Sequence, residues 1–498
     1  MRWGPGRTGS REQPDGRRDA RPGGGVRGSG RTAFVPVPLE WQGTTRQVAG
    51  LYPWSVPGRL PPIGVPTGRH QLGAGVVCFD PASWFLAGLI ANPSVLVLSK
   101  PGLGKSTLVD HWAIGMAAMG YHILVPGDTK PDHVEMVRVL GGTVRTVSRG
   151  VTGTSAEAAL NPCDPGGMGA AARRIGGLAG EALLHEAIGR GATAVHTLVQ
   201  LTREGEGVRD HERAALATAL RLLCTAGPPG SSSGRAPTLP DLVALLAERP
   251  EPVRAVVLAR AHDDDYDILL DPLRRSLLAL LSGPYGGVFA GQVDRSDVDT
   301  PAMAVDTSAI RAGDPGYLAA VLVGAWSEAY GRVETAQALA TAGLAPRRRH
   351  VIILDELWRV LRAGGGAGMA DRVNELTRLN RTDGVCQIMV THGVRDLATG
   401  RDQQVEGIEH RAGALVIGGV PRQEVEALAG VVNLTDTEAA ELVSWSSTAD
   451  LDPRTRPPGS GKFLIKHSPT EPGIPVDVLL TPTELAWGGQ NSNLAWQW

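Results

Sequence analysis

One stretch of the chain constrains its fold more than any other: residues 94–107, which read SVLVLSKPGLGKST. This pattern predicts a buried strand, a loop that contains glycines, and the beginning of a helix. Backbone N–H groups around such a loop can bind an anion at the helix N-terminus, and glycines let the backbone turn tightly enough to do so. We therefore expect a nucleotide phosphate to bind here.

The loop also carries the side chains that this chemistry requires. Lys105 would reach the β- and γ-phosphates of ATP, and the hydroxyl of Ser106 would ligate Mg²⁺. Ser99 stands where such loops usually begin with a glycine. A chance turn is the alternative, which the flanking strand and helix disfavour. The predicted nucleotide-binding residues are Ser99, Lys100, Pro101, Gly102, Leu103, Gly104, Lys105, Ser106 and Thr107.

A second apolar stretch, residues 351–354, predicts a buried central strand that ends in two carboxylates, Asp355 and Glu356. An acid at the end of such a strand holds the Mg²⁺ shell in enzymes that bind nucleotides through this type of loop. An adjacent glutamate can polarise the attacking water as a general base. Two solvated acids that cap a helix are the alternative.

A third strand is expected at residues 385–391, and it brings further candidates. Thr391 and His392, at its end, could sense the γ-phosphate, although an inert histidine is the alternative for His392. Arg378 and Arg381 precede the strand and could act in trans on a neighbouring subunit's nucleotide, or lie on a solvated helix face. Residues 128–130 could also approach the nucleotide, but a turn before a helix is favoured.

The order of these patterns predicts an α/β fold with a mainly parallel sheet and an all-helical insertion. The expected parts are an Arg/Gly-rich disordered arm (1–32), a Pro-rich extended lead-in (33–75), an α/β core (76–168 and 283–485), the helical insertion (169–282) and a tail (486–498). Strands are expected at 76–79, 94–98, 121–125, 144–147, 302–306, 351–354, 385–391, 414–417, 462–466 and 475–480. Helices are expected at 83–91, 105–119, 131–140, 170–188, 210–223, 239–247 and 267–281.

Composition limits the classes of partner and compartment. The formal net charge is −2, so binding of nucleic acid would need a local patch such as the basic arm at 1–32. The four cysteines have no metal-ligand or redox spacing. No apolar run approaches the roughly 18 residues that cross a bilayer, so no membrane span is expected. We expect a cytoplasmic protein.

Together these motifs resemble the type IV secretion and conjugation ATPases of the VirB/TraC kind, which are P-loop enzymes of the FtsK/HerA-like superfamily. The sequence DELW at 355–358 is similar to that family's Asp-Glu-Ala-Trp motif. Smaller similarities are the Gly-Gly at 141–142, the Leu-Asn-Pro at 160–162 and the segment 285–291. The resemblance spans about residues 64–485. His392 replaces the family's usual glutamine, Leu357 replaces an alanine, and only the Pro-rich lead-in stands where the family has a large N-terminal domain.

The resemblance implies a RecA-like core that assembles as a homo-hexamer and hydrolyses ATP with Mg²⁺ to energise conjugative transfer or secretion. It implies membrane-associated partners from that machinery, DNA as a further partner, and a place in the cytoplasm or at the inner face of the membrane. The catalytic residues would be Lys105, Glu356, His392, Arg378 and Arg381, and the metal ligands would be Ser106 and Asp355.

Two other functions are weighed against this one. A DNA-translocating motor of the FtsK/HerA kind shares the same core, but no basic segment resembling a winged helix follows residue 485. A nucleotide-gated assembly protein with little turnover is favoured only by Ser99. The intact pair Asp355 and Glu356 disfavours it.

Overall fold

An eleven-stranded sheet runs through the part of the chain that the computed structural model describes. The described residues are 60–73, 75–147, 160–203, 207–227, 235–259, 263–283, 286–293, 300–310, 315–355, 384–393, 412–430, 432–447, 457–468 and 471–487. The strand order is β2-β1-β11-β10-β9-β3-β8-β7-β4-β6-β5. The strands are β1 (Pro66–His70), β2 (Val76–Cys78), β3 (Ser94–Leu98), β4 (Tyr121–Asp128), β5 (Thr143–Thr146), β6 (Ala302–Asp306), β7 (Arg349–Leu354), β8 (Val385–Thr391), β9 (Ala414–Ile417), β10 (Lys462–Lys466) and β11 (Ile474–Val478).

Seven neighbouring strands, from β9 through β3, β8, β7, β4 and β6 to β5, are all parallel. This confirms the predicted α/β class with its mainly parallel sheet. In the register of the central strands, Leu98 at the end of β3 pairs with Thr391 of β8 and with Ile417 of β9. The carboxyl ends of these strands therefore meet at one edge of the sheet, where ligands bind in open α/β folds.

The remaining strands extend the sheet with antiparallel pairs: β9 with β10, β10 with β11, β11 with β1, and β1 with β2. The hairpin of β10 and β11 was expected. The strand β1 was not, because Pro66–His70 lies in the stretch 33–75 that we assigned to an extended lead-in. A short strand with proline and glycine carries little signal of its own. It is defined by its pairing with β11.

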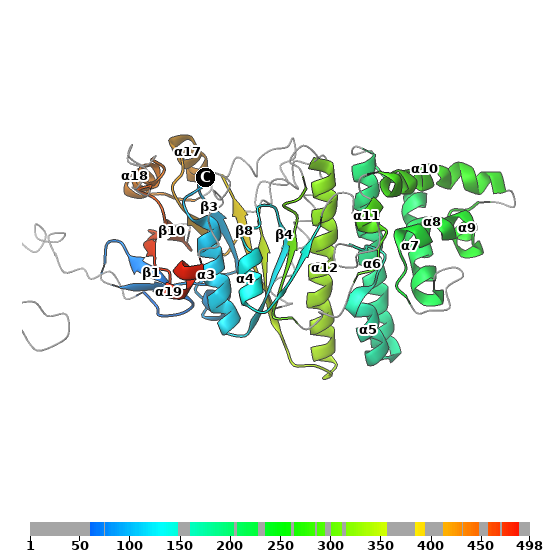
Figure 1. The fold of residues 1–498 in the computed structure, drawn as a ribbon, viewed down its shortest axis with the longest axis horizontal. Coiled ribbons are helices and arrows are strands. Elements are labelled where there is room, and N and C mark those ends of the chain that lie inside the picture. Colours follow the sequence, from blue (N-terminus) through cyan, green and yellow to red (C-terminus); the bar gives the residue numbers. More distant parts are fainter. Residues whose placement is uncertain are drawn as a thin grey trace, which may run out of the picture. The chain divides into compact units, whose positions relative to one another are not determined.

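Figure 1 shows where the helices lie relative to the sheet. They are α2 (Pro81–Leu86), α3 (Lys105–Ala118), α4 (Val134–Val139), α5 (Gly166–Ile175), α6 (Gly177–Thr202), α7 (Asp210–Ala226), α8 (Leu239–Ala247), α9 (Glu251–Val256), α10 (Asp263–Ser282), α11 (Gly286–Phe289), α12 (Pro315–Thr341), α17 (Arg422–Ala429), α18 (Asp436–Trp445) and α19 (Pro482–Trp487). The predicted single helix at 170–188 is wrong, because the chain breaks there into α5 and α6. The break lies at Gly176 and Gly177, whose φ angles of 66° and 57° are left-handed.

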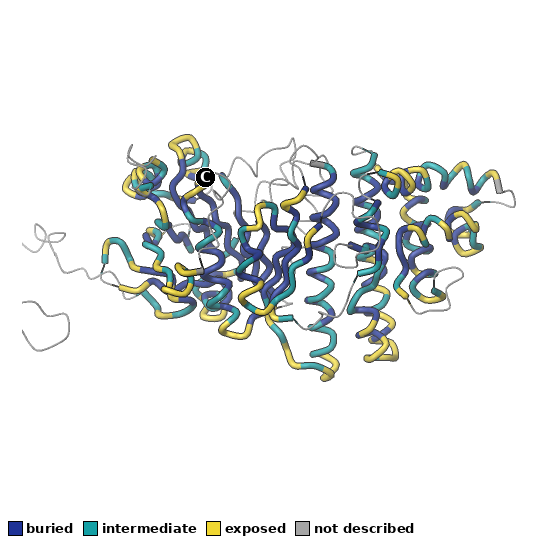
Figure 2. The backbone as a smooth tube through the Cα atoms, viewed as in Figure 1, coloured by how far each residue is buried: buried dark blue, intermediate teal, exposed yellow. Residues whose placement is uncertain are grey.

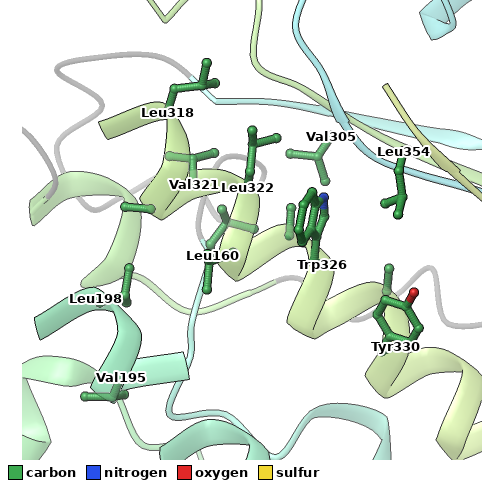
Figure 3. Close-up of a cluster of buried hydrophobic side chains, with 14 of the residues drawn as sticks. Leu160, Val195, Leu198, Val305, Leu318, Val321, Leu322, Trp326, Tyr330 and Leu354 are labelled. Carbon is green, nitrogen blue, oxygen red and sulfur yellow. The ribbon is translucent and has the colours of Figure 1, made fainter. Parts of the chain in front are cut away.

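The sheet is covered on both faces by apolar side chains. Alternate residues of β3 belong to different clusters: Leu96 and Leu98 face one way, Val95 and Val97 the other. The first cluster includes the side chains of α12 drawn in Figure 3, such as Trp326. The second includes residues of α3. In Figure 2 the strands of the sheet are mostly coloured as buried, as expected for a sheet that is covered on both faces. No helix in the described ranges is long and apolar enough to cross a membrane.

Candidate nucleotide-binding site

The predicted phosphate-binding loop joins β3 to α3 at the carboxyl edge of the parallel strands. Its two glycines have left-handed backbones, with φ of 80° at Gly102 and 94° at Gly104, which side chains rarely adopt. Gly104 is the residue immediately before the helix, so this conformation sets the entry of the chain into α3. The N–H of Gly461 donates to the carbonyl of Leu103 at 3.0 Å and ties the loop to the start of β10.

Ser99, the departure from the usual glycine, is fully buried beneath the loop. Its hydroxyl donates to the carbonyl oxygens of Lys100 at 3.2 Å and Gly419 at 3.4 Å. The neighbouring Gly418 makes room for it, because a Cβ at Gly418 would lie 2.5 Å from the Ser99 Oγ. The larger residue at position 99 is therefore accommodated by a glycine on the adjacent strand connection.

Lys105 is buried at the first position of α3, and its ammonium is turned back onto the loop. The Nζ atom donates to the carbonyl of Ser99 at 2.6 Å and to that of Lys100 at 3.4 Å. It also lies 3.1 Å from Nδ1 of His392, which follows β8. The structure thus brings together two residues that are 287 positions apart in the sequence, both of them predicted site residues.

Ser106 and Asp355 lie at the same edge of the sheet. Asp355 directly follows β7 and is 8% exposed. The hydroxyl of Ser106 donates at 2.9 Å to Oδ2 of Asp132, in the segment between β4 and α4. Ser106 is therefore placed among oxygen donors, which Mg²⁺ prefers. Within the described ranges, no three His, Cys, Asp or Glu side chains are grouped to hold a metal ion by themselves.

Sequence reasoning missed a buried polar network next to Ser106. The Nδ1 of His133 lies 2.6 Å from Oδ1 of Asp110, and both side chains are almost fully buried. Burial alone would lower the pKa of His133, but the carboxylate of Asp110, followed by those of Asp128 and Asp355, raises it to about 10. The imidazole is therefore a buried cation at neutral pH. A signal existed: Asp110 is four residues after Ser106 on α3, so both lie on one helix face.

The segment 128–130 forms the turn that we favoured. The carboxylate of Asp128 is fully buried and accepts the backbone N–H groups of Lys130 at 3.3 Å, Asp132 at 3.1 Å and His133 at 2.7 Å. Burial raises the pKa of Asp128, and the nearby imidazolium of His133 opposes that shift. The carboxylate thus organises the backbone that presents Asp132 to Ser106.

Two further predicted residues have partners at the rim of the loop. Lys100 is exposed, and its Nζ donates to the carbonyl of Ser446 at 3.3 Å, after α18. Thr391 is buried, and its hydroxyl donates to the carbonyl of Gly393 at 3.4 Å. The predicted catalytic residues Glu356, Arg378 and Arg381 lie outside the described residues.

Comparison with solved structures decides the fold. VirB4 of Thermoanaerobacter pseudethanolicus superimposes with a TM-score of 0.61 at 18% identity, over 85% of this chain and 98% of that one. The chain shares the fold of VirB4. The α/β core with its phosphate-binding loop is therefore a RecA-like P-loop fold, and the resemblance to the VirB kind of ATPase is confirmed at the level of fold.

Other solved structures match less closely. The bacterial conjugative coupling protein TrwB matches with a TM-score of 0.46 at 14% identity, over 78% of this chain and 86% of that one. The complex of TrwB with ADP and Mg²⁺ matches with a TM-score of 0.42 at 14% identity, again over 78% of this chain and 86% of that one. No family model and no curated protein matches the sequence.

Proposed function

We propose that this protein is a P-loop ATPase that binds and hydrolyses ATP to energise conjugative DNA transfer or type IV secretion. The observation that carries the proposal is the position of the Lys105 ammonium. The ammonium contacts the carbonyl oxygens of the phosphate-binding loop and the ring of His392, at the carboxyl edge of the sheet. A γ-phosphate that entered the loop would compete with those carbonyls for the same cation. The VirB4 fold supports the proposal.

The residues divide the chemistry between them. The backbone N–H groups at the start of α3 would bind the phosphates, aided by the helix dipole. Lys105 would neutralise charge on the β- and γ-phosphates, and His392 beside it would respond to the γ-phosphate. Glu356 would take a proton from the attacking water as general base. Arg378 or Arg381 of a neighbouring subunit would stabilise the charge that develops as the phosphoryl bond breaks.

Mg²⁺ fits the donors that lie at this edge. The hydroxyl of Ser106 and the carboxylate of Asp355 are hard oxygen ligands, and Asp132 adds another carboxylate at 2.9 Å from the hydroxyl. So small a set of protein ligands is typical of Mg²⁺, which completes its octahedron with water and phosphate oxygens. When bound, the ion would neutralise charge shared between the β- and γ-phosphates. The buried cation His133 would hold Asp110 and Asp128 in place beneath it.

The assembly that we propose is a homo-hexamer, with each nucleotide between two subunits, because the trans arginines need a neighbour. It would act in the cytoplasm or at the inner face of the membrane, with membrane-associated secretion or conjugation components and DNA as partners.

The proposal is tested by measuring phosphate release from ATP by the purified full chain, with and without Mg²⁺. We expect Mg²⁺-dependent turnover. Negative-stain images with a non-hydrolysable ATP analogue, with and without single-stranded DNA, should show six-membered rings. Tight ATP binding without turnover would instead indicate a nucleotide-gated assembly protein.

A further inference from the structure

A cavity lies at the opposite edge of the sheet from the P-loop. It is formed by the amino ends of β4 and β7, the C-terminal half of α12 and the end of α5, and its volume is about 240 Å³. His122 near the start of β4 lines it, and Asp128 at the end of the same strand lies at the nucleotide edge. Six residue steps of an extended strand separate these two ends by about 20 Å. The cavity is therefore a separate place in the fold.

The lining of this cavity is strongly cationic. Its polar members are Arg174, Arg332, Arg348, His122, His350 and Thr300, and no carboxylate is among the described lining residues. Three guanidinium groups line it, from α5, from α12 and from the segment before β7. A concentration of positive charge without a lining acid favours an anionic occupant.

Two of the guanidinium groups have protein partners. Arg174 donates to the carbonyl of Leu344 at 3.4 Å, and Arg332 pairs with Glu328, one turn earlier on α12, at 3.6 Å. These contacts reduce the conformational entropy that the two side chains would lose when an anion binds. Arginine's planar fork also matches the oxygens of a phosphate.

Two buried polar atoms in the lining lack a hydrogen-bond partner among the residues that the structure describes: Nδ1 of His350 and Oγ1 of Thr300. His350 is only 4% exposed, so its unpaired nitrogen carries a desolvation cost that a ligand could offset. Its ring lies 5.6 Å, centroid to centroid, from that of His122, which is oriented by a 3.0 Å contact between its Nδ1 and the carbonyl of Thr300.

We propose that this cavity binds a small organic phosphate, with its phosphoryl group on the arginines and its carbon part on the apolar lining. Leu124, Leu339 and Leu344 supply that apolar surface. At about 240 Å³, the cavity lies just below the roughly 300–1,000 Å³ typical of small-molecule sites, so it would fit only a compact molecule. A small, partly apolar cavity suits a compact molecule better than the continuous backbone of a nucleic acid, which needs an extended basic track.

The test uses calorimetric titration of the full chain with phenyl phosphate, carried out in the Lys105→Ala background so that the P-loop contributes little. The decisive pair is Arg348→Ala against Arg347→Ala: these neighbours lose the same charge, but Arg347 is exposed and does not line the cavity. We expect Arg348→Ala to weaken binding by about ten-fold or more, and Arg347→Ala to change it by less than about two-fold. A second variant, Arg332→Ala, should weaken binding in the same way.

Several results would overturn the proposal. Equal losses in the two neighbouring variants would mean that only general surface charge is sensed. Binding that disappears in the Lys105→Ala background and is present with Lys105 intact would place the ligand at the P-loop. Displacement of phenyl phosphate by a short single-stranded oligonucleotide, with equal dependence on Arg347 and Arg348, would indicate a nucleic-acid surface. Benzyl alcohol, which lacks the phosphate, should not bind, and its binding would contradict the assigned role of the arginines.

Discussion

Gly418 lies directly against Ser99. A Cβ built on Gly418 would be 2.5 Å from Oγ and 2.7 Å from Cβ of the serine, closer than real Cβ contacts come. Gly418 follows β9, which neighbours β3 in the sheet, so the two residues meet because their strands are paired in parallel. The unusual serine of the P-loop and the glycine across from it are one structural unit.

This relationship predicts that Gly418→Ala displaces Ser99 and distorts the P-loop. We expect the free energy of unfolding to fall by about 1–3 kcal/mol, as for other overpacked sites, with a loss of ATP turnover. Adding Ser99→Gly should restore most of both, since it removes the clashing hydroxymethyl group. Urea denaturation and phosphate release measure the two effects.

The matched control for Gly418→Ala is Gly189→Ala on α6, where nothing lies within 4 Å of the added Cβ. It should be neutral or slightly stabilising, because alanine is the better helix former. If Gly418→Ala behaved like Gly189→Ala, or if Ser99→Gly gave no rescue, the coupling of the two residues would be wrong.

Lys105→Ala should abolish ATP hydrolysis and most nucleotide affinity. The variant removes the cation that lies 2.6 Å from the loop carbonyl of Ser99, and the described loop places no other buried ammonium there. Turnover and binding of a fluorescent ATP analogue are the measurements. Arg138→Ala on α4, an exposed cation paired with Glu135, is the control and should leave both unchanged. Near wild-type turnover in Lys105→Ala would contradict the P-loop assignment.

The two acids after β7 should separate in role. Glu356→Gln should bind ATP normally but hydrolyse it more slowly by orders of magnitude, because only water activation is lost. Asp355→Asn should instead raise the Mg²⁺ concentration needed for half-maximal turnover. Full turnover by Glu356→Gln would mean that another group is the base.

The trans arrangement predicts that subunits complement one another. Arg381→Ala and Glu356→Gln subunits should each be inactive alone, and their mixture should regain part of the activity because one class of interface is intact. A second mixture combines Arg378→Ala subunits with Glu356→Gln subunits. An added arginine is typically worth roughly 10³–10⁵ in rate, so even a small fraction of intact interfaces would be detected.

Specific activity should also rise with protein concentration as subunits assemble. Activity that is independent of concentration, together with no rescue in either mixture, would indicate a site complete within one chain.

The stability of the protein should depend on pH through His350. Burial, followed by the charges of His122 and Arg348, lowers the pKa of His350 to about 3. The unfolded chain therefore binds a proton near pH 6.5 that the folded chain does not bind. The stabilisation is fully present above that pH and is lost as the pH falls toward 3. The loss would be about 3 kcal/mol near pH 4.5.

Urea denaturation of wild type and His350→Gln between pH 4 and 8 measures this contribution. The difference between their free energies of unfolding should shrink as the pH falls, since the glutamine does not titrate. The control is His185→Gln at an exposed position on α6. Its free energy of unfolding should change with pH in the same way as that of the wild type. Parallel curves for His350→Gln would contradict the assigned pKa direction.

Much of the strand and helix pattern was predictable because it is local. The predicted bounds of β3, β6, β8, β9 and β10 equal those in the structure. Each is a short apolar run with turn residues on both sides, a signal that needs no partner to be recognised. The helix α12 was missed although it is 27 residues long, since the sheet and the helices α5 and α6 cover it on both sides. A helix buried in this way lacks the 3.6-residue alternation on which prediction depends.

The sequence by itself determined the phosphate-binding loop, the α/β class and the residue types of the candidate site, because hydrophobic period and glycine conformation are properties of neighbouring residues. Only the tertiary structure decided which of those residues meet. The order β9-β3-β8-β7-β4 places Gly418 against Ser99 and His392 at 3.1 Å from the Lys105 ammonium. It also buries His133 with Asp110 and gathers three arginines at the far edge. Such contacts join residues that are distant along the chain, and they follow from which strands pair, a choice made by the packing of the whole sheet.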